Sequence, residues 1–536
     1  MQASASGDGP STARGILAAP SRGEHVWRWW AAAGVAAVVL SVLSVLRYTV
    51  VHLNADGIEQ SVASVQHVTL FFWGQDRFAS VVSLLASPIA DPAANLFACA
   101  FLNALAVHGL LLLLAWLGYG AVRGQRSAQG TALLFVTSAL VLHVALDPTT
   151  LHQLCIESQP FALSWVAALG AFELWRRDRW WIRALSAGAV GVAVGLSQLS
   201  LAAAAAAALV DAARCMRRDG VPAVLRRWVP FAAVWVVWLV VWGWLGLRFG
   251  GIELPEVGHS SYLSFNPVRA LTGASTSLHN IVAAFRPLPA LLIALLAVGG
   301  VVAAAVPHPA RRRLAAAAGF GALFAIGYWV LLTGNGWVEG NLFLVRYYFP
   351  VVVTVVLALG VGLTLGVEAV WAALPARAGA VRPAVVAALS ACVIAVVATG
   401  GPLRSPDEAV VLHNTQDTAQ YVREHDIRFV TGSFWVVLPV LHQVLADGRD
   451  AAYSLSSKSS EDRAAYLAAL DEAAARGAVE AVCAGDAVDT CIGYLEHWTR
   501  PGWVDAGVDC PVPVADPNLG PNAGTCRVLE YVGAEG

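Results

Sequence analysis

The sequence is poor in charge, and above all in lysine. Only 13% of its residues are Asp, Glu, Lys or Arg, and Lys458 is the only lysine. Soluble domains carry roughly 25% charged residues, so most of this chain is not expected to face water. The shortage also argues against nucleic-acid binding, because the arginines fall in short clusters between apolar runs and form no continuous basic face. With 57% hydrophobic residues, the composition indicates a membrane protein.

Several functional motifs are missing too. The sequence has no H-E-x-x-H, no P-loop and no C-x-x-C. The glycine-rich run that begins at Gly188 lies inside an apolar span, where it predicts close helix packing rather than phosphate binding. Acids within the expected spans are rare, and Glu173, Asp211 and Glu368 all fall near their cytoplasmic ends. Transporters usually keep acids or bases inside their spans, so this scarcity favours other functions.

Apolar runs of about 20 residues, each able to cross a hydrocarbon layer roughly 30 Å thick, recur along the chain. We expect a polytopic α-helical membrane protein with eleven spans, at residues 28–51, 96–119, 128–147, 160–176, 182–198, 199–214, 227–249, 287–306, 313–333, 348–373 and 383–402. The 182–214 region is open to two interpretations: one long tilted helix, or two short helices that meet at Gln198. We favour two, because the positive-inside rule then holds throughout.

Arginine clusters predict the orientation of these spans. They fall in alternate connections, at residues 14–28, 123–126, 176–183, 214–227, 311–313 and 377–382, which we therefore place in the cytoplasm. The polar N-terminal residues lead into a span too long for a signal peptide, so we expect no cleavage. The predicted domains are a cytoplasmic tail at 1–27, a transmembrane domain at 28–402 and an extracytoplasmic domain at 403–536.

The last 134 residues differ in character from the rest, because helical patterns alternate there with short β-type runs such as "IRFVTG" and "CRVLEYV". This alternation predicts a small α/β domain. It contains Cys483, Cys491, Cys510 and Cys526, and an oxidising compartment would permit disulfides. Three pairings are possible. We favour the two nearest-neighbour pairs, and the alternative is four free buried thiols.

Polar residues gather in the connections that this topology places outside. The first such connection contains "NADGIEQSVASVQHVTLFFWGQDRF", Asn54 to Phe78, where charges alternate with aromatic side chains. Later outer connections carry Asp147, His152, Glu157 and His259. A site at this outer surface can receive a lipid head group from the bilayer and a second substrate from water.

Several of these features together resemble the GT-C class of polyprenyl-phosphate-sugar-dependent glycosyltransferases. They are a first span that ends in "LRYTVVHLNADG", the long first outer loop with "FFWGQDRF", the Arg-aromatic motif "FLVRYYFP", long loops on one side and an α/β tail. The resemblance implies a catalytic base in the first outer loop, which by position maps onto Asp56. The frequent Asp-Glu pair of the class is Asp56-Gly57 here, with Glu59 one helical turn later as the second catalytic candidate.

The chemistry of the reaction suggests the remaining roles. A carboxylate can deprotonate an acceptor hydroxyl, and an arginine fork matches phosphate oxygens. We predict Arg346 as the principal phosphate ligand, and we expect the neighbouring Tyr347, Tyr348 and Phe349 to flank the lipid phosphate at the membrane interface. The other predicted substrate-binding residues are Arg77, Trp73, Asp76, Tyr347, His152, Glu157 and His259. Asp147 is a candidate ligand for a divalent metal ion, as second-loop acids are in some members of the class.

Each of these residues has a simpler explanation. Asp56 could cap the helix that begins near Gly57, Asp147 could start a turn before Pro148, and Asp76 with Arg77 could form a surface ion pair. Arg346 could be an interfacial anchor, and the aromatic residues of the first loop, Trp73 among them, could belong to a membrane-interface belt.

The sequence thus predicts an enzyme of a bacterial cytoplasmic membrane. It would transfer a sugar from a polyprenyl-phosphate donor to an extracytoplasmic glycan, lipid or protein, in contact with membrane lipids and not with nucleic acid. The alternatives are a transporter or flippase for a lipid-linked or small polar substrate, and a scaffold whose tail recruits other enzymes.

Overall fold

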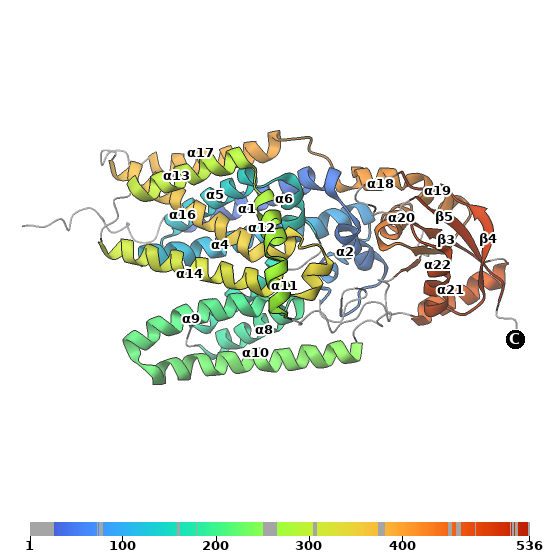
Figure 1. Cartoon of the computed structure of the whole chain (residues 1–536), viewed down its shortest axis with the longest axis horizontal. Coiled ribbons are helices and arrows are strands. Elements are labelled where there is room, and N and C mark those ends of the chain that lie inside the picture. Colours follow the sequence, from blue (N-terminus) through green and yellow to red (C-terminus); the bar gives the residue numbers. More distant parts are fainter. Residues whose placement is uncertain are drawn as a thin grey trace, which may run out of the picture.

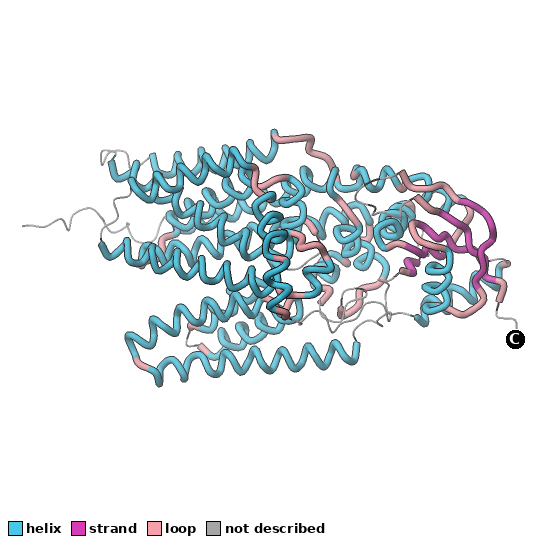
Figure 2. Tube along the Cα trace, in the orientation of Figure 1, coloured by secondary structure: helices cyan, strands magenta, loops and turns pink. Residues whose placement is uncertain are grey.

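A computed structural model shows a long helical bundle with a small sheet-containing domain at one end (Figure 1). The structure describes residues 26–71, 73, 79–157, 161–177, 179–249, 265–303, 308–373, 381–448, 453–456, 463–477, 479–514, 516, 519 and 524–533. Among these residues all strands lie in the C-terminal domain, and the bundle consists of helices joined by loops (Figure 2). The fold class expected from the sequence is confirmed.

Each of the eleven expected spans corresponds to a helix. These helices are α1 (Val26–His52), α4 (Pro92–Arg123), α5 (Ala128–Ala145), α7 (Phe161–Trp175), α8 (Trp180–Leu196), α9 (Ser200–Asp219), α10 (Val221–Phe249), α13 (Pro287–Ala303), α14 (His308–Thr333), α16 (Phe349–Ala373) and α17 (Val381–Thr399). By length and composition, seven are able to cross a membrane: α1, α4, α5, α10, α14, α16 and α17. Three more, α7, α8 and α13, are apolar but shorter.

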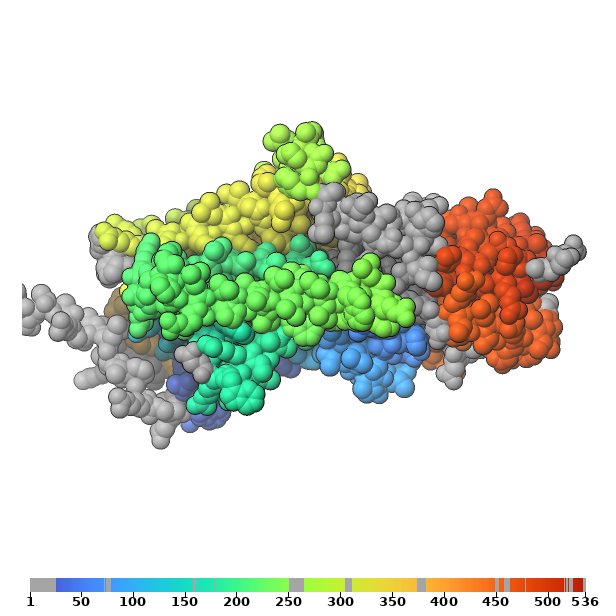
Figure 3. Space-filling view, turned by 90° about the horizontal axis from the view of Figure 1, so that it is seen from below, coloured from blue at the N-terminus to red at the C-terminus, as the bar shows by residue number. Residues whose placement is uncertain are grey.

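The 182–214 region forms two helices, as expected. The break spans residues 197–199, because Ser197 takes an extended conformation with φ −166° and ends α8. The Ser200 hydroxyl then donates a hydrogen bond to the Ala193 carbonyl oxygen at 3.1 Å. α10 packs against both helices and runs along the face of the bundle seen in Figure 3.

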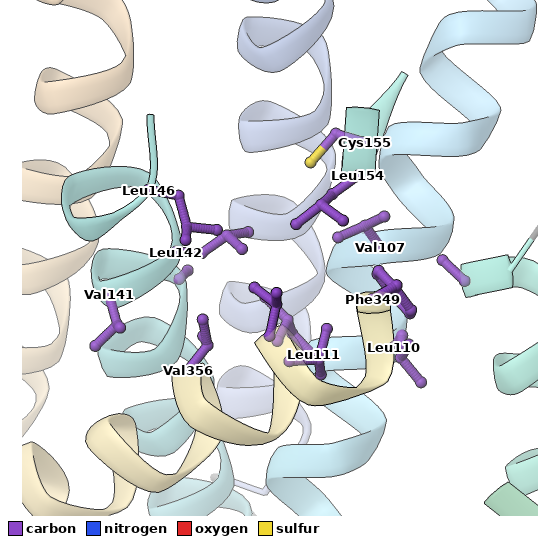
Figure 4. Close-up of a cluster of buried hydrophobic side chains, with 14 of the residues drawn as sticks. Val107, Leu110, Leu111, Val141, Leu142, Leu146, Leu154, Cys155, Phe349 and Val356 are labelled. Atoms are coloured by element: carbon purple, nitrogen blue, oxygen red, sulfur yellow. The ribbon is translucent and has the colours of Figure 1, made fainter. Parts of the chain in front are cut away.

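The core of the bundle is continuous and apolar. Figure 4 shows part of it, where side chains of α4, α5 and α16 meet those of the short helix α6 (Pro148–Cys155). Val107, Leu111, Leu142 and Val356 are each at most 2% exposed. This packing fixes the ends of α1, α5 and α16, from which the connections near the C-terminal domain start.

Short helices occupy those connections. They are α2 (Ala55–Gln66), α3 (Val81–Ala86), α6, α11 (Pro267–Thr272), α12 (Ala274–Ala283), α15 (Gly336–Gly340) and the 3-10 helix η2 (Val345–Tyr348).

The C-terminal domain has a five-stranded sheet of order β2-β1-β3-β5-β4. The strands are β1 (Phe429–Gly432), β2 (Tyr453–Leu455), β3 (Val479–Ala484), β4 (Trp503–Asp509) and β5 (Cys526–Tyr531). β1 is parallel to β2 and β3, and β5 is antiparallel to β3 and β4. Its helices are η4 (Pro406–Glu408), α18 (Val410–Asn414), α19 (Gln416–Glu424), α20 (Phe434–Ala446), α21 (Arg463–Arg476) and α22 (Val488–Trp498).

Both expected disulfides are present. Cys483 pairs with Cys491 and Cys510 pairs with Cys526. The first links β3 to α22, and the second links the strand β5 to the segment that follows β4. The predicted pairing is therefore confirmed.

The helix α2 joins the bundle to the C-terminal domain. It packs against α4 on one side and α20 on the other. One apolar cluster contains Ile58 and Val62 of α2 together with Val437 and Leu441 of α20. The position of α2 therefore depends on both parts of the molecule.

The end of the bundle away from the C-terminal domain carries a group of ion pairs. We call it the arginine end. Its ion pairs are Arg123–Glu368, Arg126–Glu173, Arg176–Glu173, Arg176–Asp211 and Arg227–Asp211. The connection between α9 and α10 lies at this end, far from the sheet (Figure 1). The acids that the sequence places near cytoplasmic span ends are thus paired with arginines there.

Candidate active site

The candidate site begins where α1 passes into α2. Asn54 takes an extended conformation, and its side-chain oxygen accepts a hydrogen bond from the Gly57 amide at 3.2 Å. This is a helix cap of the ordinary kind. Asn54 and not Asp56 caps the helix, so the simpler explanation for Asp56 does not hold. Asp56 is instead the second residue of α2.

Arg346 brings two distant acids together. Its Nη1 donates to Asp56 Oδ2 at 2.7 Å and to Glu157 Oε2 at 2.7 Å. The three side chains are nearly inaccessible to solvent, at 7% exposure for Arg346, 8% for Asp56 and 2% for Glu157. We call these residues the carboxylate–arginine trio. They come from η2, from α2 and from the turn that follows α6.

The amide nitrogen of the Asn54 side chain holds Glu157. Asn54 Nδ2 donates to Glu157 Oε1 at 3.0 Å, while the oxygen of the same amide caps α2. The turn that carries Glu157 is itself fixed, because Asn103 of α4 donates to the Ile156 carbonyl oxygen at 3.2 Å. Asn54 therefore connects the cap of the Asp56 helix directly to the second acid.

The trio has more acid than base. With both carboxylates ionised it carries a net charge of −1, in a place where few groups can be solvated. Burial raises the pKa of Glu157, and the negative charge of Asp56 acts in the same direction, while Arg346 and Asn54 oppose it. Two buried acids around one base are costly, and the shifted pKa of Glu157 makes the trio a candidate functional site.

Part of the Arg346 guanidinium remains available. Its Nε has no hydrogen-bonding partner in the part of the chain that the structure describes. Nη2 contacts only the Tyr347 hydroxyl, at a long 3.5 Å, and the guanidinium carbon lies 5.3 Å from the centre of the Tyr347 ring. The edge formed by Nε and Nη2 has the geometry that binds two phosphate oxygens.

Tyr348 and Phe349 differ from the expectation that they flank a lipid phosphate. Tyr348 is fully buried, and its hydroxyl lies 3.1 Å from Thr333 Oγ1. Phe349 packs against Trp165 of α7. Both side chains therefore belong to the bundle core.

Two histidines lie beside the trio. His152 on α6 is buried, and its ring centre is 6.0 Å from that of His52 at the end of α1. Burial lowers the pKa of His152 to about 3, with His52 adding to the effect and Asp56 opposing it. His152 is therefore a neutral neighbour of the trio at physiological pH.

Asp147 has a structural role in this arrangement. It caps α6, with Oδ1 accepting from the Thr150 amide at 3.0 Å and Oδ2 from the Thr150 hydroxyl at 2.5 Å. The described residues include no group of three or more His, Cys, Asp or Glu side chains placed to hold a metal ion. They do not fit a resident metal at Asp147, so that role stays a prediction and no mechanistic step below uses it.

The two first-loop aromatic residues that the structure describes, Phe71 and Trp73, are buried in protein. Trp73 is 2% exposed, donates to the His67 carbonyl oxygen at 3.1 Å and belongs to the apolar cluster of α2 and α20. Phe71 packs edge-on against Trp242 of α10. Trp73 therefore has no open ring face for a sugar or a prenyl chain, and these two residues do not form an interfacial belt.

The remaining candidates divide into two groups. Glu59 lies on α2 one turn after Asp56 and is 1% exposed, and its role as a second catalytic candidate stays a prediction. Asp76, Arg77 and His259 lie outside the described residues.

Sequence reasoning missed three features. Asn54 and His52 were not singled out, although an Asn directly before an amphipathic run is a helix-start signal. Inside the bundle, His108 Nε2 lies 3.1 Å from His143 Nε2, and His143 Nδ1 lies 3.2 Å from the Tyr48 hydroxyl. His108 and His143 lie within the expected spans 96–119 and 128–147, so the scarcity of acids there does not mean that the spans lack titratable side chains.

Comparison with known proteins supports the fold. No protein-family model matches the sequence, and no curated protein sequence matches it. A crystal structure of ArnT from Cupriavidus metallidurans, bound to undecaprenyl phosphate, superposes with a TM-score of 0.50 at 15% identity, covering 95% of this chain and 98% of ArnT. The chain has the fold of ArnT. The GT-C resemblance is thereby confirmed at the level of architecture.

A second structure is related more distantly. Arabinosyltransferase EmbB from Mycobacterium smegmatis matches with a TM-score of 0.32 at 16% identity, over 66% of this chain and 32% of EmbB.

Proposed function

We propose that this protein is a membrane-bound glycosyltransferase of the GT-C type, which moves a sugar from a polyprenyl-phosphate donor to an acceptor hydroxyl outside the cytoplasmic membrane. The observation that carries the proposal is the carboxylate–arginine trio, which combines a base and a phosphate-binding edge at one end of a membrane bundle. The ArnT fold supports the donor class, because that protein was solved with undecaprenyl phosphate.

Asp56 is the proposed general base. It accepts the proton of the acceptor hydroxyl while the acceptor oxygen bonds to the anomeric carbon and the bond from that carbon to the phosphate oxygen breaks. The electron pair of the broken bond stays on the lipid phosphate. Its place at the start of α2 supports this role, because the partial positive charge of a helix N-terminus favours an ionised carboxylate.

Arg346 is the proposed phosphate ligand. Its Nη1 holds Asp56 and Glu157, so the Nε and Nη2 edge is the part that would meet the phosphate. The residue precedes α16 directly, at the end of a helix long and apolar enough to span a bilayer. A lipid phosphate at the membrane surface would therefore be within reach of the guanidinium, and the Tyr347 ring would support it from one side.

Glu157 and Asn54 are proposed to orient Arg346, and His152 to keep the surroundings of Asp56 dry and uncharged. Arg77, Asp76 and His259 stay proposals for substrate binding, with Arg77 as a second phosphate ligand and Glu59 as the alternative base. The acceptor is proposed to be a glycan, lipid or protein of the cell envelope.

We further propose that the N-terminus and the arginine end are cytoplasmic and that the C-terminal domain is outside. The positive-inside rule supports this orientation, since the ion-paired arginines gather at the end of the bundle away from the sheet. Two disulfides in the C-terminal domain also agree with an oxidising compartment.

Native mass spectrometry of the purified protein tests the proposal. We expect a co-purified polyprenyl phosphate in the wild type and its loss in Arg346→Ala, while the matched change Arg126→Ala at the arginine end retains it. Sugar transfer from a polyprenyl-phosphate donor in nanodiscs is the second measurement. If no sugar transfer is detected and a lipid-linked substrate instead moves across the membrane of proteoliposomes, the result would support a transporter.

A further inference from the structure

The turn that precedes Arg346 has an unfavourable backbone conformation. Leu342 and Phe343 both have a φ of 54°, in the left-handed region that residues other than glycine rarely adopt. For each such residue the conformation disfavours the turn by about 5- to 30-fold. The Leu342 side chain is 76% exposed, so its own packing contributes little to offset this. Other contacts must hold the turn, and η2 with Arg346 begins directly after it, at Val345.

Asn280 of α12 supplies two of these contacts. Its Nδ2 donates to the Leu342 carbonyl oxygen at 3.1 Å and to the Phe343 carbonyl oxygen at 3.0 Å. These are the carbonyls of the two left-handed residues, 62 and 63 positions away in the sequence. One nitrogen can bond to both oxygens only while the two carbonyls face it together. The Asn280 side chain therefore selects the left-handed form of the turn.

The junction between α11 and α12 holds the Phe343 side chain. A Cβ atom at Gly273 would lie 2.5 Å from Phe343 Cζ, so the ring occupies space that any other residue at this junction would fill. The Phe343 side chain is 8% exposed and belongs to the core of the bundle. The junction and Asn280 thus fix both the ring and the backbone of Phe343.

α12 also supports the other end of η2. Ser277 is fully buried, accepts from Trp329 Nε1 at 3.0 Å and lies 3.3 Å from Thr333 Oγ1. Thr333 Oγ1 in turn lies 3.1 Å from the Tyr348 hydroxyl. In Figure 1, α11 and α12 run across the direction of the bundle helices, and α12 packs on η2. The backbone is therefore supported by α12 both before and after Arg346.

We infer that Asn280 is a positioning residue for the donor phosphate. By holding the left-handed turn it sets the start of η2, and with it the direction of the Nε and Nη2 edge of Arg346. The inference rests on the proposed function, and Asn280 acts through Arg346 without touching the phosphate. When the turn relaxes, only the fraction of molecules that keep it formed presents the edge, so the apparent Kd rises by the inverse of that fraction.

Titration of the protein in nanodiscs with undecaprenyl phosphate tests this inference. Asn280→Ala should weaken binding by about 5- to 30-fold. Adding Leu342→Gly should restore most of the affinity, because glycine adopts a positive φ without a steric penalty and the change removes only an exposed side chain. If Asn280 merely stabilised the fold, the second change would bring no rescue. His279→Ala, at an exposed neighbour on the same helix, is the matched control and should bind as wild type does.

Hydrogen–deuterium exchange reports the turn directly. The Tyr347 amide donates to the Leu344 carbonyl oxygen at 3.1 Å and is protected while η2 is formed. Asn280→Ala should speed exchange in the peptide that covers residues 342–348, and Leu342→Gly in the same chain should slow it again. If Asn280→Ala does not fold, Gly273→Ala provides the second variant. Its methyl group would displace the Phe343 ring, so it should also weaken binding and speed exchange.

The outcomes separate this inference from the proposed function. Wild-type affinity in Asn280→Ala, together with loss of binding in Arg346→Ala, would reject the inference and leave the proposed function standing. A loss in Asn280→Ala that Leu342→Gly does not rescue would also overturn it, because Asn280 would then act by a route other than the turn. No binding of undecaprenyl phosphate to the wild type would reject the proposed function, and the inference with it.

Discussion

The two ends of the bundle use arginine and carboxylate in different ways. At the arginine end, Arg126 and Glu173 form a bidentate ion pair in which both N–O distances are 2.7 Å. The side chains of Arg126 and Glu173 remain 30% and 19% exposed. At the other end, a single nitrogen of Arg346 serves two carboxylates that are almost fully buried. Water reaches the first arrangement, and Arg176 also pairs with Glu173 there, whereas water hardly reaches the second.

We interpret this difference as that between a structural role and the proposed functional role. Partly exposed ion pairs cost little to form and contribute little, so the arginine end mainly joins neighbouring helices. A buried trio of two acids and one base costs stability, and buried groups with shifted pKa values are found most often at functional sites. The predictions below test that contrast, from the largest expected effect to the smallest.

Asp56→Asn should have the largest effect. The amide keeps the shape and can still accept from Arg346, but it cannot accept a proton from the acceptor hydroxyl. General-base catalysis is worth about 10²- to 10⁴-fold, so sugar transfer should fall by about that factor while binding of the lipid donor survives. Initial rates and donor binding in nanodiscs provide the measurement.

Asp211→Asn is the matched change at the arginine end, where Asp211 pairs with Arg176 and Arg227. Transfer per folded molecule should stay at the wild-type level. If Asp56→Asn transfers sugar at near-normal rates, the base is a different residue, and Glu59 becomes the first alternative.

The sequence could predict the helices and could name Asp56, Arg346 and Glu157 as separate candidates, but it could not predict that the three side chains meet. Apolar runs gave the positions of all eleven bundle helices because span length is set by bilayer thickness, a property that each run shows locally. Arg346 lies 290 residues from Asp56 and 189 from Glu157. No local pattern links residues so far apart, and only the GT-C resemblance pointed to Asp56 and Arg346.

Trp73 shows a second feature that the sequence alone could not predict. Aromatic residues in an outer loop resemble a membrane-interface belt in sequence, and whether a protein surface covers them depends on tertiary packing. In the structure, α20 of the C-terminal domain closes over α2, and Trp73 fills part of the contact. Sequence patterns show which faces are apolar but not which faces meet.

Removal of a disulfide should have the next largest effect, a loss of stability in the C-terminal domain that packs on α2. Removing a disulfide typically costs about 2–4 kcal/mol of unfolding free energy, and more for longer loops. Cys510→Ser/Cys526→Ser opens the longer loop, with a sequence separation of 16 against 8 for the other pair. Chemical unfolding of the C-terminal domain, followed by tryptophan fluorescence, should show the loss. Cys392→Ser, at an exposed free cysteine, is the control, and an equal loss there would contradict the prediction.

Arg346→Ala should weaken donor binding by about 10- to 100-fold. Hydrogen bonds to a charged group contribute roughly 1.5–3 kcal/mol each, and the alanine removes the whole phosphate-binding edge. Arg346→Lys should restore only part of the affinity, because an ammonium group cannot reproduce the planar fork. Donor titration in nanodiscs measures both variants. Full rescue by lysine would show that charge alone, and not the fork, holds the phosphate.

His442 should make the contact between α20 and the bundle sensitive to acid. The side chain is 2% exposed, and burial lowers its pKa from 6.5 to about 4, with Asp407 and Asp91 opposing the shift. The unfolded state therefore binds the proton first as the pH falls below 6.5, so stability is lost between about pH 6.5 and pH 4. At pH 5 the loss should be about 2 kcal/mol.

His442→Leu should remove this part of the pH dependence. The measurement is the free energy of unfolding of the full chain in urea at pH 7 and at pH 5, compared between variant and wild type. His413→Leu, which changes an exposed histidine of α18, is the control and should leave the difference between the two pH values unchanged. The prediction fails if both variants have the same effect.

Glu173→Gln should have the smallest effect of all, because it breaks a partly exposed pair at the arginine end. The carboxylate holds Arg126 through two bonds of 2.7 Å and Arg176 through one of 3.1 Å. Exposed pairs contribute about 0.2–1 kcal/mol, and salt screens them. Thermal unfolding should show a small loss at low salt that nearly disappears at high salt. A large, salt-independent loss would mean that the arginine end, like the trio, holds charge that water does not reach, and the contrast between the two ends would no longer separate structure from function.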